Sequence, residues 1–144
     1  MASTRTGARL RRAFLGAALA AGAGLVPLPA GAIDWASAGV ERVVEIVTRN
    51  ADGTPRETKF WLAVVDGQGY ARTGGTRWWG NLSRDPEVVL RVAGAEHPLR
   101  AELVTDPELA AKVEAALRVK YGWSDRLISP FRFGDTHILR LVPR

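Results

Sequence analysis

Runs of apolar and β-branched residues predict short strands from residue 43 onward. The β-branched segment 43–48 predicts a first strand. The run 58–65 is almost continuously apolar, which is typical of a central strand buried on both faces. Asp66-Gly67 predicts a tight hairpin turn, after which 68–73 returns as a strand. The segment 50–55 is dense in turn formers and predicts a loop.

The second half of the chain alternates between hairpins and helices. Gly74-Gly75 should end a strand, and residues 76–82 predict a short helix. Two further strands, 88–92 and 97–103, should form a hairpin across Ala93-Gly94, and 137–142 predicts the last strand.

A longer helix should follow residue 105. Thr105-Asp106-Pro107-Glu108 has the form of a capping box, with proline in the first turn, where its missing N–H costs little. Leu109, Val113, Leu117 and Tyr121 then recur at spacing four as a one-sided apolar stripe. Six strands with one or two helices predict a mainly β fold, a small antiparallel six-stranded barrel with a packed helix.

The first 32 residues predict a cleavable twin-arginine signal peptide. Arg11-Arg12-Ala13-Phe14-Leu15 has the twin-arginine core, an apolar stretch of small residues follows to Val26, and Ala30-Gly31-Ala32 suits a signal peptidase. An uncleaved membrane anchor is disfavoured, because the stretch is shorter than the roughly 20 residues that span a bilayer and is rich in Ala and Gly. We expect cleavage near Ala32, an exported domain over 33–144 in the periplasm or outside the cell, and no permanent membrane anchor.

Charge and cysteine content limit the kinds of partner and site that the chain can have. The chain has 20 Lys and Arg against 15 Asp and Glu, but four of the arginines precede Ile33 and the first acid is Asp34. The remaining domain carries 16 basic and 15 acidic residues, a net charge of +1, which argues against nucleic acid as a partner. The absence of cysteine excludes disulfides, thiol catalysis and thiolate metal sites. His97 and His137 lie far apart without clustered acids, so no metal site is expected.

The central segments resemble a known superfamily. Five segments resemble the flavin- and deazaflavin-binding split barrels: Arg56-Glu57-Thr58, the run from Phe60 to Gly67, Tyr70 to Gly75, Trp79-x-Asn81-Leu82 and Asp85 to Val88. These are the pyridoxamine-phosphate-oxidase-like proteins, and the nearest branches are the deazaflavin-dependent nitroreductase-like proteins and a neighbouring uncharacterised family. The chain has Arg49 to Gly53 and Lys59 where many relatives have a Gly-Arg-Lys-Ser-Gly turn and a proline. FMN and an 8-hydroxy-5-deazaflavin coenzyme therefore both remain open.

The resemblance implies a cofactor site and a homodimer. A flavin needs an anion site for its phosphate and an apolar wall for its ring, and residues 72–79 offer glycines, two arginines, a helix N-terminus and two indoles. The alternative is a plain Gly-Gly turn with solvated arginines. The cofactor-binding candidates are Arg56, Thr58, Arg72, Thr73, Gly74, Gly75, Thr76, Arg77, Trp78, Trp79 and Asn81. Tyr121 continues the helical stripe, so packing is favoured for it over a place beside the substrate.

Two classes of function compete. The first is an exported flavin- or deazaflavin-dependent oxidoreductase that transfers hydride to a small acceptor, such as a quinone or nitro compound, with the cofactor supplying the chemistry. No catalytic residue can be named from the sequence. The second is a non-catalytic exported module that binds a cofactor, haem or another small molecule in the same place. An exported domain whose exposed aromatic side chains meet another protein is a third alternative.

Overall fold

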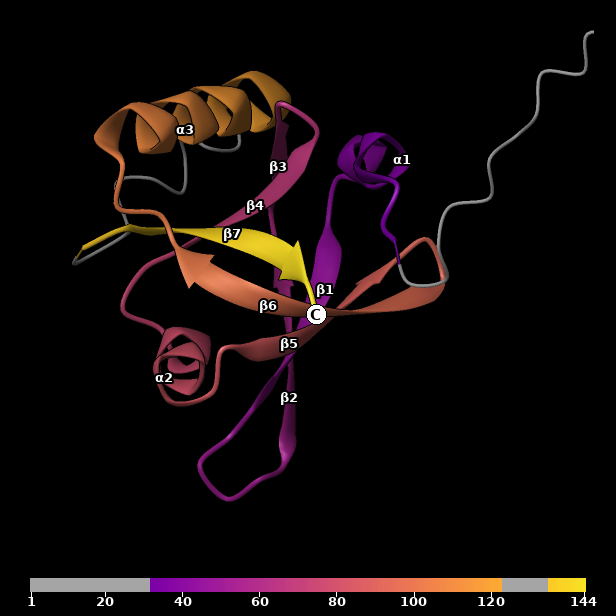
Figure 1. Cartoon of the computed structure of the whole chain (residues 1–144), viewed down its shortest axis with the longest axis vertical. Coiled ribbons are helices and arrows are strands. Elements are labelled where there is room, and N and C mark those ends of the chain that lie inside the picture. The colour runs from indigo at the N-terminus through magenta and orange to yellow at the C-terminus, as the bar shows by residue number, and fades with distance from the viewer. Residues whose placement is uncertain (1–31, 123–134) are drawn as a thin grey trace, which may run out of the picture.

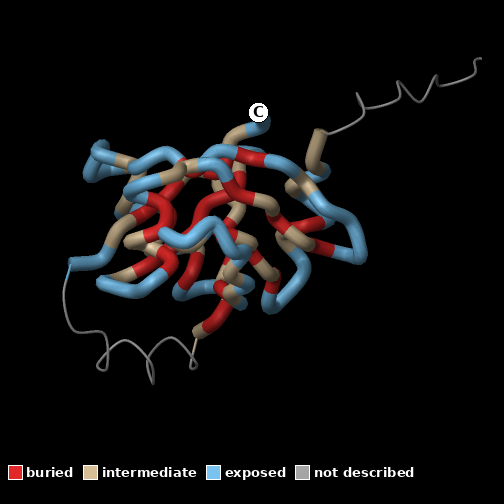
Figure 2. The backbone as a smooth tube through the Cα atoms, turned by 90° about the horizontal axis from the view of Figure 1, so that it is seen from below, coloured by how far each residue is buried: buried red, intermediate tan, exposed pale blue. Residues whose placement is uncertain are grey.

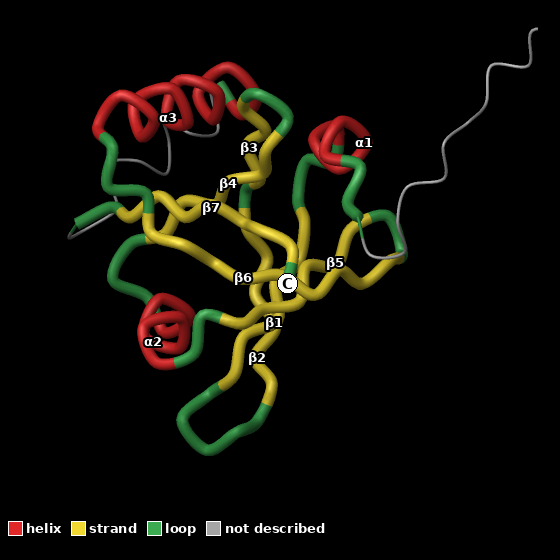
Figure 3. Tube along the Cα trace, in the orientation of Figure 1, coloured by secondary structure: helices red, strands yellow, loops and turns green. Residues whose placement is uncertain are grey.

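A single antiparallel sheet, strongly curled, organises the chain (Figures 1 and 3). The computed structural model describes residues 32–122 and 135–144. Its seven strands follow the order β2-β1-β5-β6-β7-β4-β3. In chain order the elements are α1 (Trp35–Val40), β1 (Val44–Arg49), β2 (Pro55–Phe60), β3 (Leu62–Val65), β4 (Gln68–Thr73), α2 (Arg77–Arg84), β5 (Glu87–Val92), β6 (Ala95–Leu103), α3 (Pro107–Tyr121) and β7 (His137–Pro143).

The two edges of the sheet are consecutive in sequence. The sequence predicts one central strand over 58–65, but the structure breaks this run at Trp61 into β2 and β3, which form opposite edges. The break turns the six expected strands into seven. The run is apolar at its β3 end because α3 covers one face of this strand while the main core lies on the other. Dense apolar sequence therefore indicates burial on both faces, but not a central position in the sheet.

Two apolar clusters lie on opposite faces of the sheet. The larger one fills the inner face of the curl and includes Ile46, Leu90, Leu99 and Leu141, all fully buried. The smaller one lies between α3 and strands β3, β4 and β7. Figure 2 shows the buried residues gathered inside the curl and under the covering elements. In the described part of the chain, no helix is long and apolar enough to cross a membrane.

Helix α3 carries the expected stripe but begins one residue later than the capping box suggests. Asp106, not Thr105, is the N-cap, and its carboxylate accepts the backbone N–H of Glu108 at 3.0 Å. Pro107 then takes the first helical position, where no N–H is needed. Val113, Leu117 and Tyr121 are buried against the sheet, which confirms the stripe.

Helix α1 is absent from the sequence prediction, which expects one or two helices where the described chain has three. It is six residues long, so its apolar pattern is too short to indicate a helix. The available signal is Asp34, whose carboxylate accepts the N–H groups of Ala36 and Ser37 as an N-cap. The two expected hairpin turns are confirmed, with positive φ at Asp66, Gly67, Ala93 and Gly94.

The last residues of α3 cover the exposed edge of β3. The Leu62 N–H donates to the Tyr121 hydroxyl at 3.1 Å, and this hydroxyl lies 3.3 Å from the Leu62 carbonyl. The Lys120 ammonium donates to the same carbonyl at 2.9 Å. The Tyr121 ring stacks on Trp61 with centroids 4.4 Å apart, so α3 holds the chain where β2 turns into β3. Tyr121 thus packs as the stripe predicts.

We expect Tyr121→Phe to lower the free energy of unfolding by about 1–3 kcal/mol, because the buried Leu62 N–H loses its partner. Burial also raises the pKa of Tyr121, so its stabilising effect is complete below pH ~10 and is lost as the pH rises through the raised pKa. Desolvation lowers the pKa of Lys120, and this shift changes the free energy of unfolding with pH in the opposite direction. The measurement is therefore the difference between wild type and Tyr121→Phe in urea unfolding from pH 7 to 11. A difference that does not shrink at high pH would contradict the assignment.

Candidate functional site

The segment between β4 and α2 forms a capped turn with two open glycines. Thr76 is the N-cap of α2, and its hydroxyl accepts the Trp79 N–H at 3.4 Å and lies 3.0 Å from the Thr73 hydroxyl. The Thr76 N–H donates to the Gly74 carbonyl at 2.8 Å. Neither Gly74 nor Gly75 has a positive φ, so the backbone conformation does not itself require glycine at these two positions. A Cβ at Gly75 would meet nothing within 4 Å, so these glycines leave space beside the backbone.

The two neighbouring tryptophans differ in burial and in the ring that each contacts. Trp78 is buried in the main core, where its ring lies 6.0 Å from that of Phe60. Trp79 is half-buried and stacks on the His137 ring with centroids 4.0 Å apart. Trp78 thus lies within the main core, whereas Trp79 packs at its edge. His137 joins this site as an aromatic neighbour, a role that its strand position alone did not indicate.

The two arginines of this segment have different environments. Arg72 is buried, and its guanidinium pairs with Glu114 of α3 at 2.6 Å, so it fastens β4 to the helix. Arg77 is exposed in the first turn of α2, and in the described chain its guanidinium makes no ion pair. That turn contains no acidic residue. The positive end of the helix dipole and the Arg77 charge therefore add to each other and favour an anion.

Asn81 connects α2 to the sheet. Its amide nitrogen donates to the Thr48 hydroxyl and to the Asn50 side-chain oxygen, both at 3.0 Å. Its own oxygen accepts from Arg84 at 2.6 Å. These three bonds account for the buried Asn81 side chain, so its role here is to position α2 over β1.

The inner face of β2 holds two unpartnered polar atoms. Arg56 and Thr58 alternate with outward-facing residues and share a face with the buried Phe60. The Arg56 Nε and the Thr58 hydroxyl oxygen are buried, yet neither makes a hydrogen bond to any described residue. The only other such side-chain atom in the described part of the chain is the Arg140 Nε. Because buried polar groups are nearly always paired, this pair on one strand indicates a missing acceptor.

Strand β1 brings these residues next to α2. Arg56 is the cross-strand partner of Thr48, and Thr58 is the partner of Ile46. Thr48 in turn receives the hydrogen bond from Asn81 of α2, and Phe60 packs against Trp78. The inner face of β2 and helix α2 thus meet over the end of β1. The structure brings Arg56 and Thr58 to the same region as the α2 turn, whereas it directs Arg72 toward α3.

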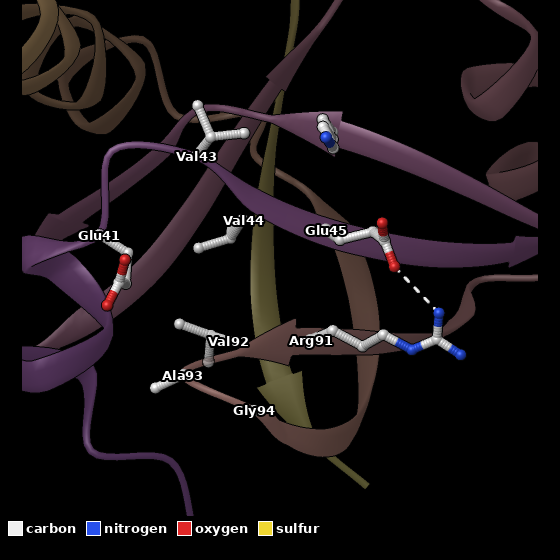
Figure 4. Close-up of a pocket in the computed structure, with 9 residues that line it drawn as sticks. Glu41, Val43, Val44, Glu45, Arg91, Val92, Ala93 and Gly94 are labelled. Carbon is white, nitrogen blue, oxygen red and sulfur yellow. Dashed lines mark hydrogen bonds and ion pairs between the residues drawn. The ribbon is translucent and has the colours of Figure 1, made fainter.

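Other features of the described chain do not coincide with this region. No group of three His, Asp or Glu side chains there could hold a metal ion. A cavity of about 190 Å³ lies near the start of β1 and the turn between β5 and β6, lined by both charged and apolar residues (Figure 4). Its Arg91 pairs with Glu45 at 2.9 Å and with Glu96 at 2.7 Å, and also contacts Glu57, so its charge is already balanced.

Comparison with known proteins places the fold. The model of a family described as "Uncharacterized protein conserved in bacteria (DUF2255)" matches residues 36–133. A conserved hypothetical protein of Mycobacterium tuberculosis, Rv2991, is similar in structure, with TM-score 0.59, 23% identity, and coverage of 76% of this chain and 77% of the other. The haem storage protein HutZ of Vibrio cholerae gives TM-score 0.59, 18% identity and coverage of 72% and 82%.

A third similar structure bears the name "Putative Pyridoxamine 5'-phosphate oxidase" and comes from Listeria innocua, with TM-score 0.54, 15% identity and coverage of 76% of this chain and 89% of the other. No curated protein matches the sequence significantly. The structural neighbours confirm that the chain has the split-barrel fold of the pyridoxamine-phosphate-oxidase-like superfamily.

Proposed function

Because the chain belongs to the DUF2255 family of uncharacterised bacterial proteins and has the split-barrel fold, we propose that it binds a flavin-type cofactor between β2 and α2. The observation that carries this proposal is the pair of unpartnered buried groups, Arg56 Nε and Thr58 Oγ1. Each leaves a hydrogen-bonding position that a ligand oxygen would fill. An unsatisfied buried group costs about 1–3 kcal/mol, so an acceptor here would restore a corresponding part of the stability.

The α2 turn supplies the second half of the site. Arg77 and the N-terminus of α2 would hold the phosphate, with Thr73, Gly74, Gly75 and Thr76 forming the backbone beside it. Trp79 on His137 offers an apolar surface for the ring. Arg72, Trp78 and Asn81 would act indirectly, since they fix β4 and α2 in place.

The proposed activity is reduction of a small acceptor, such as a quinone or nitro compound. In its reduced form, a bound FMN or 8-hydroxy-5-deazaflavin would supply the hydride and would itself be oxidised, so a separate electron donor would have to reduce it again. The chain's own residues would bind the phosphate, orient the ring and exclude water, and no side chain is needed as a catalytic acid or base. The second candidate is a non-catalytic module that binds haem, favoured by the haem storage protein among the similar structures.

Titration of the purified protein with FMN, the deazaflavin and haem tests the proposal. We expect a saturable change in cofactor absorbance and quenching of tryptophan fluorescence with FMN or the deazaflavin, followed by oxidation of the reduced cofactor by a quinone. Binding of haem alone would favour the second candidate. Binding of none of the three would refute the cofactor site.

We further propose that the domain works outside the cytoplasm, after export through the twin-arginine machinery and cleavage near Ala32. Replacing Arg11 and Arg12 together with Lys should leave the precursor in the cytoplasm, because the export machinery recognises the arginine pair. Cell fractionation with mass spectrometry of the exported form, expected to begin at Ile33, provides the measurement. An exported protein that retains residues 1–32 would argue against a cleaved signal.

A homodimer is the proposed assembly. The resemblance to split barrels supports it. Light scattering at micromolar concentration with cofactor present should give the dimer mass, and a monomer mass would exclude this assembly.

A further inference from the structure

A second cavity lies on the face of the sheet that α3 covers. Its volume is about 200 Å³, and it opens between the first turn of α3 and strands β6 and β7. Its lining residues are Glu102, Leu103, Val104, Thr105, Asp106, Leu109 and Arg140. The cofactor site proposed above lies on the inner face of the curl, so the two regions are separate.

Arg140 is the unusual member of this lining. Its Nε is buried and makes no hydrogen bond to any described residue, the only such atom besides those of Arg56 and Thr58. Its guanidinium carbon lies 6.0 Å from the ring centroid of Tyr70 on the neighbouring strand β4. Contact with an aromatic face restrains a guanidinium and leaves its N–H edge available. Arg140 is therefore a positioned cation with an unused donor.

The surrounding acids do not neutralise this cation. Glu102 is the cross-strand partner of Arg140, yet the two form no ion pair in the structure, and Glu102 is exposed. Asp106 is occupied as the N-cap of α3, where its carboxylate accepts the Glu108 N–H. An acceptor for the buried Nε must therefore come from outside the described residues.

The other residues that line the cavity indicate which kind of ligand would provide this acceptor. Leu103, Val104 and Leu109 give the cavity an apolar side, and Leu103 is 50% exposed at its edge. A carboxylate matches the paired N–H groups of a guanidinium, and a short apolar body would cover the leucines. The charge of Glu102 disfavours an anion with more than one charge. We propose that this cavity binds a small monocarboxylate through Arg140, with its hydrocarbon part against Leu103 and Leu109.

The test is a titration of the protein with hexanoate, followed by NMR chemical shifts, with hexan-1-ol as the uncharged probe. We expect saturable shifts with hexanoate at residues of α3 and β7, and clearly weaker binding of the alcohol. Arg140→Gln should weaken hexanoate binding about tenfold or more, since it removes a charge-assisted hydrogen bond. Glu102→Gln should strengthen binding several-fold by removing a like charge.

Arg100→Gln is the matched control, because Arg100 is an exposed arginine on the same strand as Glu102 and lies outside the cavity. It should bind hexanoate as wild type does. Thermal melts of all three variants show whether they remain folded. Absence of saturable binding in wild type, equal binding by folded Arg140→Gln, or equal binding of hexan-1-ol would each overturn the proposal.

Discussion

Trp78→Ala is expected to lower the free energy of unfolding by about 3–5 kcal/mol, the usual cost of removing a buried aromatic side chain. The Trp78 side chain is only 6% exposed and packs on Phe60 where α2 meets β2. Its loss would leave a cavity between the helix and the main core, and α2 would lose its packing on Phe60. Urea unfolding followed by circular dichroism measures the change.

Trp79→Ala provides the matched control, because it removes the same side chain from the next position. It should cost less, about 1–2 kcal/mol, since Trp79 is only half-buried and gives up a ring stack on His137 and a contact at the edge of the main core. If the two variants lose equal stability, the difference in burial between the two rings is wrong. If Trp79→Ala keeps its stability but binds FMN or deazaflavin more weakly, Trp79 serves the ring surface proposed above.

Arg77→Ala is expected to weaken cofactor binding by about ten- to a hundredfold while costing less than ~0.5 kcal/mol of stability. A charge-assisted hydrogen bond to a phosphate contributes about 1.5–3 kcal/mol, whereas an exposed arginine without a partner contributes little to folding. The measurements are titration of FMN and the deazaflavin beside thermal melts. If Arg77→Ala binds the cofactor as tightly as wild type does, the fold assignment stands, but the phosphate does not bind at Arg77.

Thr58→Val tests the β2 side of the same site, and unlike Arg77→Ala it should not lower the free energy of unfolding. Valine has nearly the shape of threonine, and it removes a buried hydroxyl that has no hydrogen-bond partner among the described residues. Stability should therefore stay the same or rise, while cofactor affinity falls about two- to tenfold through loss of one neutral hydrogen bond. Lys59→Ala, on the outer face of the same strand, is the control and should leave affinity unchanged.

Much of the fold can be predicted because local signals dominate it. The hairpin turns at Asp66-Gly67 and Ala93-Gly94, the Thr76 cap and the α3 stripe all depend on residues close together in sequence. The break at Trp61 is not local. It depends on α3, far along the chain, whose Tyr121 binds the backbone of Leu62. A continuous apolar run carries no mark of such a break, so two strands appear as one.

The candidate site was predictable in composition but not in arrangement. Residue types and spacing suggest an anion site near Arg77, and the resemblance adds Arg56 and Thr58. Sequence alone does not reveal that Glu114 engages Arg72, or that Thr48 and Asn50 engage Asn81. These partners lie on other elements, and only the folded chain brings them together. The signal available for Thr48 is its position in the alternating inner row of β1.

The contact of Tyr121 and Lys120 with Leu62 has a consequence for aggregation. An uncovered strand edge offers free N–H and C=O groups to another chain, which can add to it as an extra strand. Here the end of α3 occupies those groups at the start of β3. Local unfolding of the last turn of α3 would uncover this edge while the rest of the sheet stayed folded. The end of α3 thus protects the β3 edge from pairing with a strand of another chain. Variants that destabilise this last turn should aggregate from a nearly native state.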